Sequence, residues 1–194
     1  WQDFMFSCAF YPSDSDYLDN CRCDIEENII RLRNRACLAL WCGNNEIEWF
    51  LAEGHAGEKT AQRKRQYSKI FHELIPSLVG KLDPDTAYWP SSPASDRRFE
   101  DPNGQTSGDG HFWGVWHGRQ PFTAYRTQFH RFMSEFGFES LPALETIKTF
   151  AGKDDLNMTS PVMEAHQKNR AGNGLILHYL AQSFRFPRNF EMMV

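Results

Sequence analysis

The chain has 194 residues, of which 41% are hydrophobic and 24% are charged. This composition is typical of a globular domain with a buried core and excludes disorder, collagen and coiled coil. The 21 basic and 25 acidic residues are mixed along the chain and give a formal charge of -4, so no nucleic-acid-binding surface is predicted. No apolar run approaches the roughly 18 to 20 residues that span a bilayer, so no membrane association is predicted. We expect a single domain over residues 1–194.

The opening segment WQDFMFSCAFYP has no initiator Met and is predicted to begin inside a strand. Because natural domain boundaries usually carry a less structured lead-in, we expect the chain to be part of a longer protein. Its compartment is then not determined by these residues, since any leader would precede them.

Apolar residues spaced three or four apart predict an amphipathic helix within residues 13–35. The run CLALWC at 37–42 lacks alternation, as expected of a strand buried on both faces of a parallel sheet. A second helix is predicted around 67–78, with Gly80 as its C-terminal cap. A short strand at 88–93 follows, and residues 94–110 have the composition of a long loop, which often carries function.

The pattern of strands and helices continues to the end of the chain. Further strands are predicted at 111–113 and 132–136, and further helices at 122–130 and 142–150. Ser160 followed by Pro161 predicts a helix start, with an interruption at AGNG (171–174) and a resumed helix over 175–184.

The alternation of strands and helices predicts an α/β fold with a mostly parallel sheet and right-handed crossovers. An open doubly wound sheet and a closed (β/α)8 TIM barrel both satisfy this pattern. The sequence has no Gly-x-Gly-x-x-Gly after the first strand and no phosphate loop, which disfavours nucleotide-binding folds. Because a whole barrel needs about 250 residues, we expect a partial TIM barrel of about five of the eight units.

The five cysteines lie at positions 8, 21, 23, 37 and 42. Their odd number and the apolar sequence around the last two predict buried free thiols. Cys21 and Cys23 fall in a helical pattern that points them about 200° apart, whereas zinc prefers a Cys-x-x-Cys pair on a turn. We therefore predict no metal site, and the free thiols favour a cytoplasmic protein.

Two carboxylates follow predicted strands, where the reactive groups of a barrel lie. Glu46 follows the buried strand in WCGNNEIEWF, and Glu135 ends the strand in RFMSEFGFES. Facing carboxylates, one protonated and one ionised, are what glycosidic bond cleavage needs. The neighbouring Asn45 adds a carboxamide that can hold a sugar hydroxyl.

A structural interpretation of both residues stays open at this point. Glu46 can simply begin a helix, where the helix dipole favours an acidic residue, and Glu135 can be a solvated strand end. Glu48 and Glu139 lie nearby and are alternative catalytic carboxylates.

The chain closely resembles the catalytic barrel of β-mannosidases of glycoside hydrolase family 2. The resemblance extends over nearly the whole chain, and Gly-Asn-Asn-Glu with Ser-Glu-Phe-Gly in this order is its most specific part. The segments that carry it are WQDFMFSCAFYP, ENIIRLRN, ALWCGNNEIEW, YWPSSP, GDGHFWGVWHG, RFMSEFGFESLP and HQKNRAGN.

The resemblance implies a retaining mechanism, with Glu46 as general acid/base and Glu135 as the nucleophile that becomes mannosylated. It implies that Asn45 holds the sugar 2-hydroxyl and that Trp1 packs on the sugar at the mouth of the third strand. The chain would cover the third to the seventh or eighth strand, without the first two strands and the N-terminal β-sandwich domains. Relatives often have a Tyr that hydrogen-bonds the nucleophile, where this chain has His111, Phe112 and Trp113.

Three further side chains are predicted to bind substrate: His111, Trp113 and Trp116. Pyranose rings stack on aromatic faces, although tryptophans are equally suited to a core. His111 and His117 could be metal ligands, but we favour a hydrogen-bonded His in a polar cleft. The implied function is an exo-β-mannosidase that acts on oligosaccharides and needs no cofactor. Another family 2 β-glycosidase and a non-catalytic carbohydrate-binding fragment remain alternatives, and no pattern indicates the oligomeric state.

Overall fold

The computed structural model describes residues 1–194 and divides into two compact units. The first unit contains Trp1–Phe112 and Gln128–Phe136, and the second contains Trp113–Thr127 and Gly137–Val194. The single domain expected over 1–194 stays a prediction beside this division. None of the helices is both long and apolar enough to cross a membrane.

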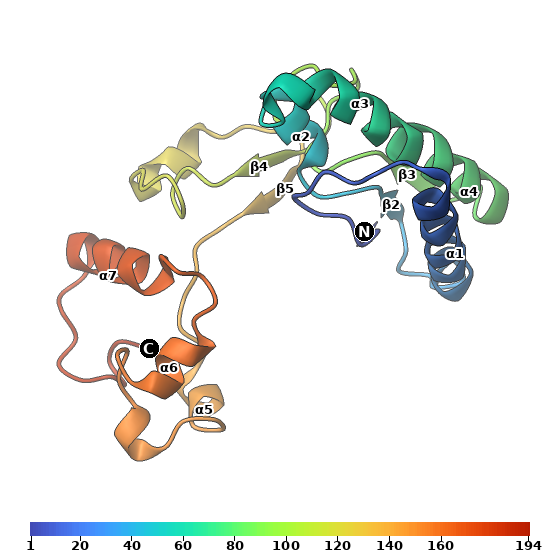
Figure 1. Ribbon diagram of the computed structural model, residues 1–194. Coiled ribbons are helices and arrows are strands. Elements are labelled where there is room, and N and C mark those ends of the chain that lie inside the picture. The colour runs from blue at the N-terminus through green and yellow to red at the C-terminus, as the bar shows by residue number, and fades with distance from the viewer. The chain divides into compact units, whose positions relative to one another are not determined.

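The first unit contains a parallel three-stranded sheet in the order β1-β2-β3. Figure 1 labels two of these strands, β2 and β3. Its strands are β1 (Gln2–Asp3), β2 (Leu40–Cys42) and β3 (Ala87–Trp89). Beyond these short strands, Asn45 forms isolated parallel bridges to Ser7 on one side and to Ser92 on the other. The segment that continues β2 is therefore paired on both sides as far as Asn45.

A second parallel sheet of the first unit pairs β4 (Gly110–Phe112) with β5 (Met133–Phe136). The register is irregular between Gly110 and His111, so that His111 pairs with Glu135. Such bulges add a residue to one strand and re-aim the side chains beside it. The irregularity brings the imidazole of His111 and the carboxylate of Glu135 to the same place.

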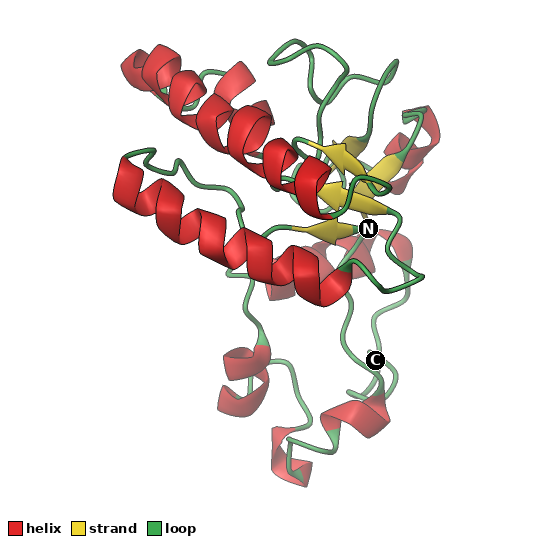
Figure 2. Cartoon of the chain, turned by 90° about the vertical axis from the view of Figure 1, so that its right-hand side faces the viewer, coloured by secondary structure: helices red, strands yellow, loops and turns green.

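The helices of the first unit lie together on one side of the three-stranded sheet (Figure 2). They are α1 (Ser15–Leu32), α2 (Ile47–Ala52), α3 (Thr60–Ser68) and α4 (Ile75–Leu82), with a π-helical stretch, Lys69–Leu74, joining α3 to α4. Asp14 caps α1 by accepting a hydrogen bond from the Tyr17 amide at 3.0 Å. The buried residues Cys21, Ile25 and Ile29 recur every fourth position of α1, which places them on one face of the helix.

The core of the first unit forms where these helices meet the sheet. Ile25 and Ile29 of α1 are fully buried, as are Trp41 of β2 and Ile75 of α4. Burial of each such side chain contributes about 1.5–3 kcal/mol. The expected helix over 13–35 and the buried strand ending at Cys42 are both confirmed, although β2 begins only at Leu40.

Gly80 does not cap the second predicted helix, which corrects the sequence prediction. The helix continues through Gly80 to Leu82, and Asp83 is its C-terminal cap. Pro84 follows, and the residue before a proline is disfavoured in helical conformation. The proline therefore ends the helix, while the glycine is accommodated within its last turn.

The second unit consists of short helices and connecting segments. It contains the 3₁₀ turns Phe122–Thr127 and Lys153–Asp155 and the helices α5 (Leu144–Ile147), α6 (Pro161–His166) and α7 (Gly172–Ser183). Ser160 caps α6 by accepting a hydrogen bond from the Met163 amide at 3.2 Å, as its place before Pro161 predicts. The unit has two apolar clusters, one centred on Trp116 and Leu175 and the other on Ile147 and Met163.

Three helix predictions in the second unit need correction. The helix expected over 122–130 is a 3₁₀ turn that ends at Thr127, and the helix expected over 142–150 is only α5. The AGNG segment (171–174) does not interrupt the last helix, because α7 begins at Gly172. The break lies just before it, where the Gln167 and Asn169 side chains accept hydrogen bonds from nearby backbone amides and so compete with helical pairing.

All five cysteines are free, as predicted, but only Cys21 and Cys42 are buried. Cys8, Cys23 and Cys37 are exposed, which corrects the expectation of five buried thiols. Cys23 is exposed because it lies on the face of α1 opposite to Cys21.

The parallel pairing of every strand confirms the α/β pattern expected from the sequence. The strands form one sheet of three and one of two, so a partial (β/α)8 barrel is not established by this topology and stays a prediction.

Candidate active site

Glu46 lies at the start of α2, as its N-terminal cap residue, in a left-handed backbone conformation (φ 65°, ψ 0°). Its amide donates a hydrogen bond to the Ser92 carbonyl at 2.7 Å. Positive φ values are uncommon for residues other than glycine, and strained residues gather at functional sites. The backbone thus holds Glu46 in a conformation that local propensity does not favour.

The two asparagines before Glu46 have different roles. Asn44 is fully buried, and its Oδ1 accepts hydrogen bonds from the Ile47 amide at 3.1 Å and the Ser91 hydroxyl at 2.8 Å. It therefore supports the first turn of α2. The amide nitrogen of Asn45 lies 3.5 Å from Ser7 Oγ, while its Oδ1 is buried without a hydrogen-bond partner. A buried acceptor without a partner is costly, so Asn45 is suited to accept a hydrogen bond from a ligand.

Glu46 and Glu135 meet at His111. The imidazole Nδ1 lies 3.1 Å from Glu46 Oε1 and 3.4 Å from Glu135 Oε2. The His111 side chain is fully buried, whereas the carboxylates of Glu46 and Glu135 are 13% and 37% exposed. Both acids can therefore reach a ligand, while the imidazole lies behind them.

Asp109 and Ser92 form the next layer behind His111. Ser92 Oγ lies 2.9 Å from His111 Nε2 and 2.7 Å from Asp109 Oδ2. The same carboxylate accepts hydrogen bonds from Ser134 Oγ at 2.6 Å, Trp89 Nε1 at 3.0 Å and the Ala94 amide at 3.1 Å. Asp109 and Ser92 are both buried, so this hydrogen-bonded chain is shielded from solvent.

Cys8 also contacts Glu46, through a distance of 3.4 Å from its Sγ to Oε2. Although the residue is exposed, partial desolvation of its thiol raises the pKa of Cys8, and the contact with the Glu46 carboxylate raises it further. The thiol is therefore the protonated form near neutral pH.

The predicted tryptophans are distributed over both units. Trp1 is 45% exposed, stacks on Phe132 with ring centroids 5.7 Å apart, and donates a hydrogen bond to Asp3 at 2.6 Å. Trp116 is buried in the core of the second unit, and Trp113 packs against the same cluster. Substrate binding by Trp113 and Trp116 stays a prediction.

Of the two alternative carboxylates, Glu48 is buried and makes its hydrogen bonds within the protein. It is 1% exposed, and it accepts hydrogen bonds from the Tyr67 hydroxyl at 2.7 Å and the Phe99 amide at 2.9 Å. Both of its oxygens are therefore engaged within the protein interior.

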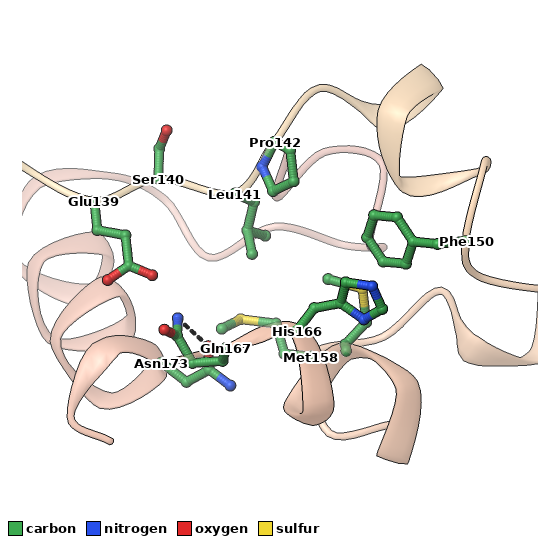
Figure 3. A pocket seen from close by; sticks show the side chains of 10 residues that line it. Glu139, Ser140, Leu141, Pro142, Phe150, Met158, His166, Gln167 and Asn173 are labelled. Atoms are coloured by element: carbon green, nitrogen blue, oxygen red, sulfur yellow. Dashed lines mark hydrogen bonds between the residues drawn. The ribbon is translucent and has the colours of Figure 1, made fainter. Parts of the chain in front are cut away.

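Glu139 lines a cavity of about 170 Å³ in the second unit. Figure 3 shows Glu139 with Gln167 and Asn173 at one end of this cavity and the His166 ring against Phe150 at the other. The imidazole and phenyl rings are stacked with centroids 3.9 Å apart. Glu139 thus lines a cavity of the second unit, whereas Glu46, His111 and Glu135 meet in the first unit.

The cluster of Glu46, His111 and Glu135 is also able to offer ligand atoms to a cation, because one atom from each lies within 4.8 Å of the others. The two carboxylates also contact the His111 imidazole directly, and these contacts need no metal. The sequence predicts no metal here, and that stays a prediction.

Sequence reasoning missed the second layer of this site. Asp109 lies at the end of the long loop predicted to carry function, and Ser134 directly precedes Glu135. Those positions are signals, but nothing in the sequence indicates that Ser92 and Asp109 meet behind His111. Cys8 was predicted to be a buried free thiol, whereas its Sγ contacts the Glu46 carboxylate.

Known proteins resemble this chain over its whole length, although no family model matches it. It is 34% identical to β-mannosidase B of Aspergillus flavus and 34% identical to that of Aspergillus niger. In both cases the match covers 100% of this chain and 24% of the relative. The crystal structure of β-D-mannosidase from Dictyoglomus thermophilum superimposes with a TM-score of 0.87 and 38% identity, over 100% of this chain and 23% of that one.

These findings make the chain β-mannosidase-like from end to end. β-Mannosidases are glycoside hydrolases, and the chain spans about a quarter of the length of the relatives it matches.

Proposed function

We propose that this β-mannosidase-like chain forms part of the catalytic domain of a retaining exo-β-mannosidase, which removes terminal non-reducing β-D-mannose residues from oligosaccharides. The observation that carries the proposal is the meeting of Glu46 and Glu135, since a carboxylate oxygen of one lies within 4.8 Å of a carboxylate oxygen of the other. Carboxyl groups about 5–5.5 Å apart are typical of retaining glycosidases, whereas inverting enzymes keep about 6.5–9.5 Å to admit a water. The short separation favours double displacement.

In the first step Glu135 attacks the anomeric carbon while Glu46 gives its proton to the departing glycosidic oxygen. The C1–O bond to the aglycone breaks, and a mannosyl ester forms on Glu135. In the second step Glu46 takes a proton from water, which attacks the same carbon and breaks the ester. Once the ester has formed, Glu135 no longer bears a negative charge, and this favours the ionised form of Glu46 that the second step requires.

Asn45 is proposed to bind the sugar beside the nucleophile. Its buried Oδ1 lacks a protein partner and could accept a hydrogen bond from a sugar hydroxyl. Hydrogen bonds to the 2-hydroxyl strengthen in the oxocarbenium-like transition state. Trp1, exposed next to Phe132, offers an aromatic face on which the sugar can stack.

We also propose glycoside hydrolase family 2 as the family and residues 1–194 as a portion of its TIM barrel, from about the third strand to the seventh or eighth. The parallel strands and the positions of Glu46 and Glu135 after β2 and in β5 support this assignment. No cofactor enters the proposed reaction. The five free cysteines support a reducing compartment such as the cytoplasm.

The test is to trap the covalent intermediate in the protein that carries this chain, at its full length. The protein is treated with a 2-deoxy-2-fluoro-mannosyl fluoride, digested, and mapped by mass spectrometry. We expect a fluoromannosyl adduct on the peptide that contains Glu135, and its absence from the Glu135→Gln variant. An adduct on another carboxylate would overturn the assignment of the nucleophile.

Sugar specificity is tested separately with aryl β-glycosides. We expect the aryl β-mannoside to be hydrolysed with the highest kcat/KM. A preference for the galactoside, glucuronide or glucosaminide would indicate another family 2 activity, and binding of mannoside without hydrolysis of any substrate would indicate a carbohydrate-binding protein.

A further inference from the structure

The direction of the hydrogen bonds behind His111 follows from the donors around Asp109. Four donors converge on its carboxylate, two on Oδ1 from Trp89 and Ala94 and two on Oδ2 from Ser92 and Ser134. An ionised carboxylate only accepts hydrogen bonds, so this arrangement fits the ionised form. Hydroxyl bonds to a carboxylate are short and strong, and the Ser92 hydroxyl, 2.7 Å from Oδ2, gives its single hydrogen to Asp109.

The protonation of the imidazole follows from that direction. With its hydrogen given to Asp109, Ser92 Oγ can only accept from His111 Nε2, which lies 2.9 Å away. Nε2 therefore carries a hydrogen, since the partner of one ring nitrogen determines the state of the other. Nδ1 is left facing Glu46 Oε1 at 3.1 Å and Glu135 Oε2 at 3.4 Å.

One proton then lies between Nδ1 and Glu46. When Nδ1 holds it, Glu46 is ionised and the imidazole donates to the carboxylates. When Glu46 holds it, its hydroxyl donates to Nδ1. The opposite tautomer, with hydrogen on Nδ1 and none on Nε2, would place a donor toward a protonated Glu46 and disfavour that form.

We propose that Asp109 and Ser92 are positioning residues that keep hydrogen on His111 Nε2, so that Nδ1 and Glu46 share the proton that the leaving group receives. This inference rests on the proposed function and extends it, because it gives the acid a proton-sharing partner. The charged and titratable groups around His111 are Glu46 and Glu135 at Nδ1, Asp109 through Ser92 at Nε2, and the Cys8 thiol on Glu46.

The most informative variant is Asp109→Asn, which replaces one carboxylate oxygen by an NH₂ group of similar size. The carboxamide oxygen must face Trp89 and the Ala94 amide, because both are donors. Its NH₂ then faces Ser92 and donates to it, and the Ser92 hydroxyl turns to donate to Nε2. The variant thus reverses the chain and moves hydrogen to Nδ1 without removing a contact.

Ser92→Ala interrupts the same chain by removing its middle member. Ser134→Ala is the matched control, because it removes a hydroxyl that is bonded to the same Asp109 oxygen, at 2.6 Å, and lies 3.3 Å from Ser92 Oγ, while no hydrogen bond joins it to the His111 ring. Each variant is first checked for folding by its thermal unfolding temperature. Two variants that interrupt the chain in different ways keep the test open if one of them does not fold.

The readout is the dependence of kcat/KM on the leaving group, measured with the full-length protein. A β-mannosyl disaccharide needs a proton for its leaving alcohol, whereas 2,4-dinitrophenyl β-mannoside does not. Because general acid catalysis contributes about 10²–10⁴-fold, we expect Asp109→Asn and Ser92→Ala to lose at least about tenfold more activity on the disaccharide. Ser134→Ala should lose the same small factor on both substrates.

A loss that is equal on both substrates would mean that Asp109 and Ser92 only support the structure, and it would overturn the proposal. If the unmodified protein hydrolyses neither substrate, the proposed function fails, and the imidazole is examined directly. In ¹⁵N-histidine-labelled protein, with His111 assigned through His111→Gln, we expect a protonated Nε2 that loses its proton in Asp109→Asn. An unprotonated Nε2 in the unmodified protein would overturn the inference whatever its activity.

Discussion

The Sγ atom of Cys8 lies 3.4 Å from Oε2 of Glu46, so an exposed thiol contacts the carboxylate proposed as the acid/base. The two residues are brought together by the parallel bridge between Ser7 and Asn45. A group attached to this sulfur would therefore lie against the Glu46 carboxylate.

We predict that alkylation of Cys8 by iodoacetamide abolishes hydrolysis of β-mannosides. Partial desolvation raises the pKa of the Cys8 thiol, and only the thiolate reacts, so inactivation should be slow near pH 7 and accelerate as the pH rises. Cys8→Ala should keep its activity after treatment. Cys23→Ala, which removes another exposed thiol, should remain as sensitive as the unmodified protein, and protection by that variant would contradict the assignment to Cys8.

Replacement of Glu46 tests the acid/base role. In Glu46→Ala we expect kcat/KM on a β-mannosyl disaccharide to fall by about 10²–10⁴-fold, the usual contribution of general acid–base catalysis. Hydrolysis of 2,4-dinitrophenyl β-mannoside should be accelerated by azide, with β-mannosyl azide as the product. The exposed Glu73 provides a control, since Glu73→Ala should behave as the unmodified protein. Formation of the α-azide would instead indicate loss of the nucleophile.

Glu48 is predicted to contribute to stability and not to chemistry. Its carboxylate accepts hydrogen bonds from Tyr67 and the Phe99 amide in the interior, and removal leaves buried donors without a partner. We expect Glu48→Ala to lower the free energy of unfolding by about 2–4 kcal/mol, measured by urea denaturation, whereas Glu73→Ala should change it by less than about 0.5 kcal/mol. A fully stable Glu48→Ala protein without activity would favour a catalytic Glu48.

Alkaline pH is predicted to destabilise the fold through buried tyrosines. Burial raises the pKa of Tyr67 and of Tyr88 well above the ordinary value of 10.0. Above about pH 10 the unfolded chain loses these protons while the folded protein keeps them, so the free energy of unfolding falls as the pH rises. The stabilising contribution of the two buried tyrosines is fully present below about pH 10.

Tyr88→Phe isolates one of these groups. The variant loses the hydrogen bond from the Tyr88 hydroxyl to the Phe71 carbonyl, 2.8 Å long, at a cost of about 1 kcal/mol. Above pH 10 the free energy of unfolding should fall less steeply in the variant than in the unmodified protein. The two slopes should differ by about 1.4 kcal/mol per pH unit. Urea denaturation at several pH values measures both effects, and an unchanged slope would contradict the burial argument.

The sequence predicted the elements that depend on periodicity and local capping. The amphipathic spacing around Ile25 and Ile29 and the Ser160 cap both survive in the structure, because they depend on neighbours within one or two turns. The Gly80 prediction failed because a glycine near a helix end resembles a cap, while the stop itself comes from Pro84.

The candidate site was predictable only in part. Glu46 and Glu135 were predicted from their places after strands and from the family resemblance, and the structure brings both carboxylates to His111. The chain from Asp109 through Ser92 to His111 was not found, since it depends on the register shift beside Gly110 and on segments 17 and 19 residues apart. The sequence shows which residues exist, whereas their contacts depend on how the strands are aligned.

The backbone hydrogen bonds on either side of Glu46 have a practical consequence. The Asn45 carbonyl accepts from the Cys8 amide, and the Glu46 amide donates to the Ser92 carbonyl, so the main chain is held independently of the Glu46 side chain. Glycine tolerates the left-handed conformation at this position. Glu46→Gly should therefore preserve the backbone of the site while removing the carboxylate, and its slow turnover would suit crystallisation with intact oligosaccharides.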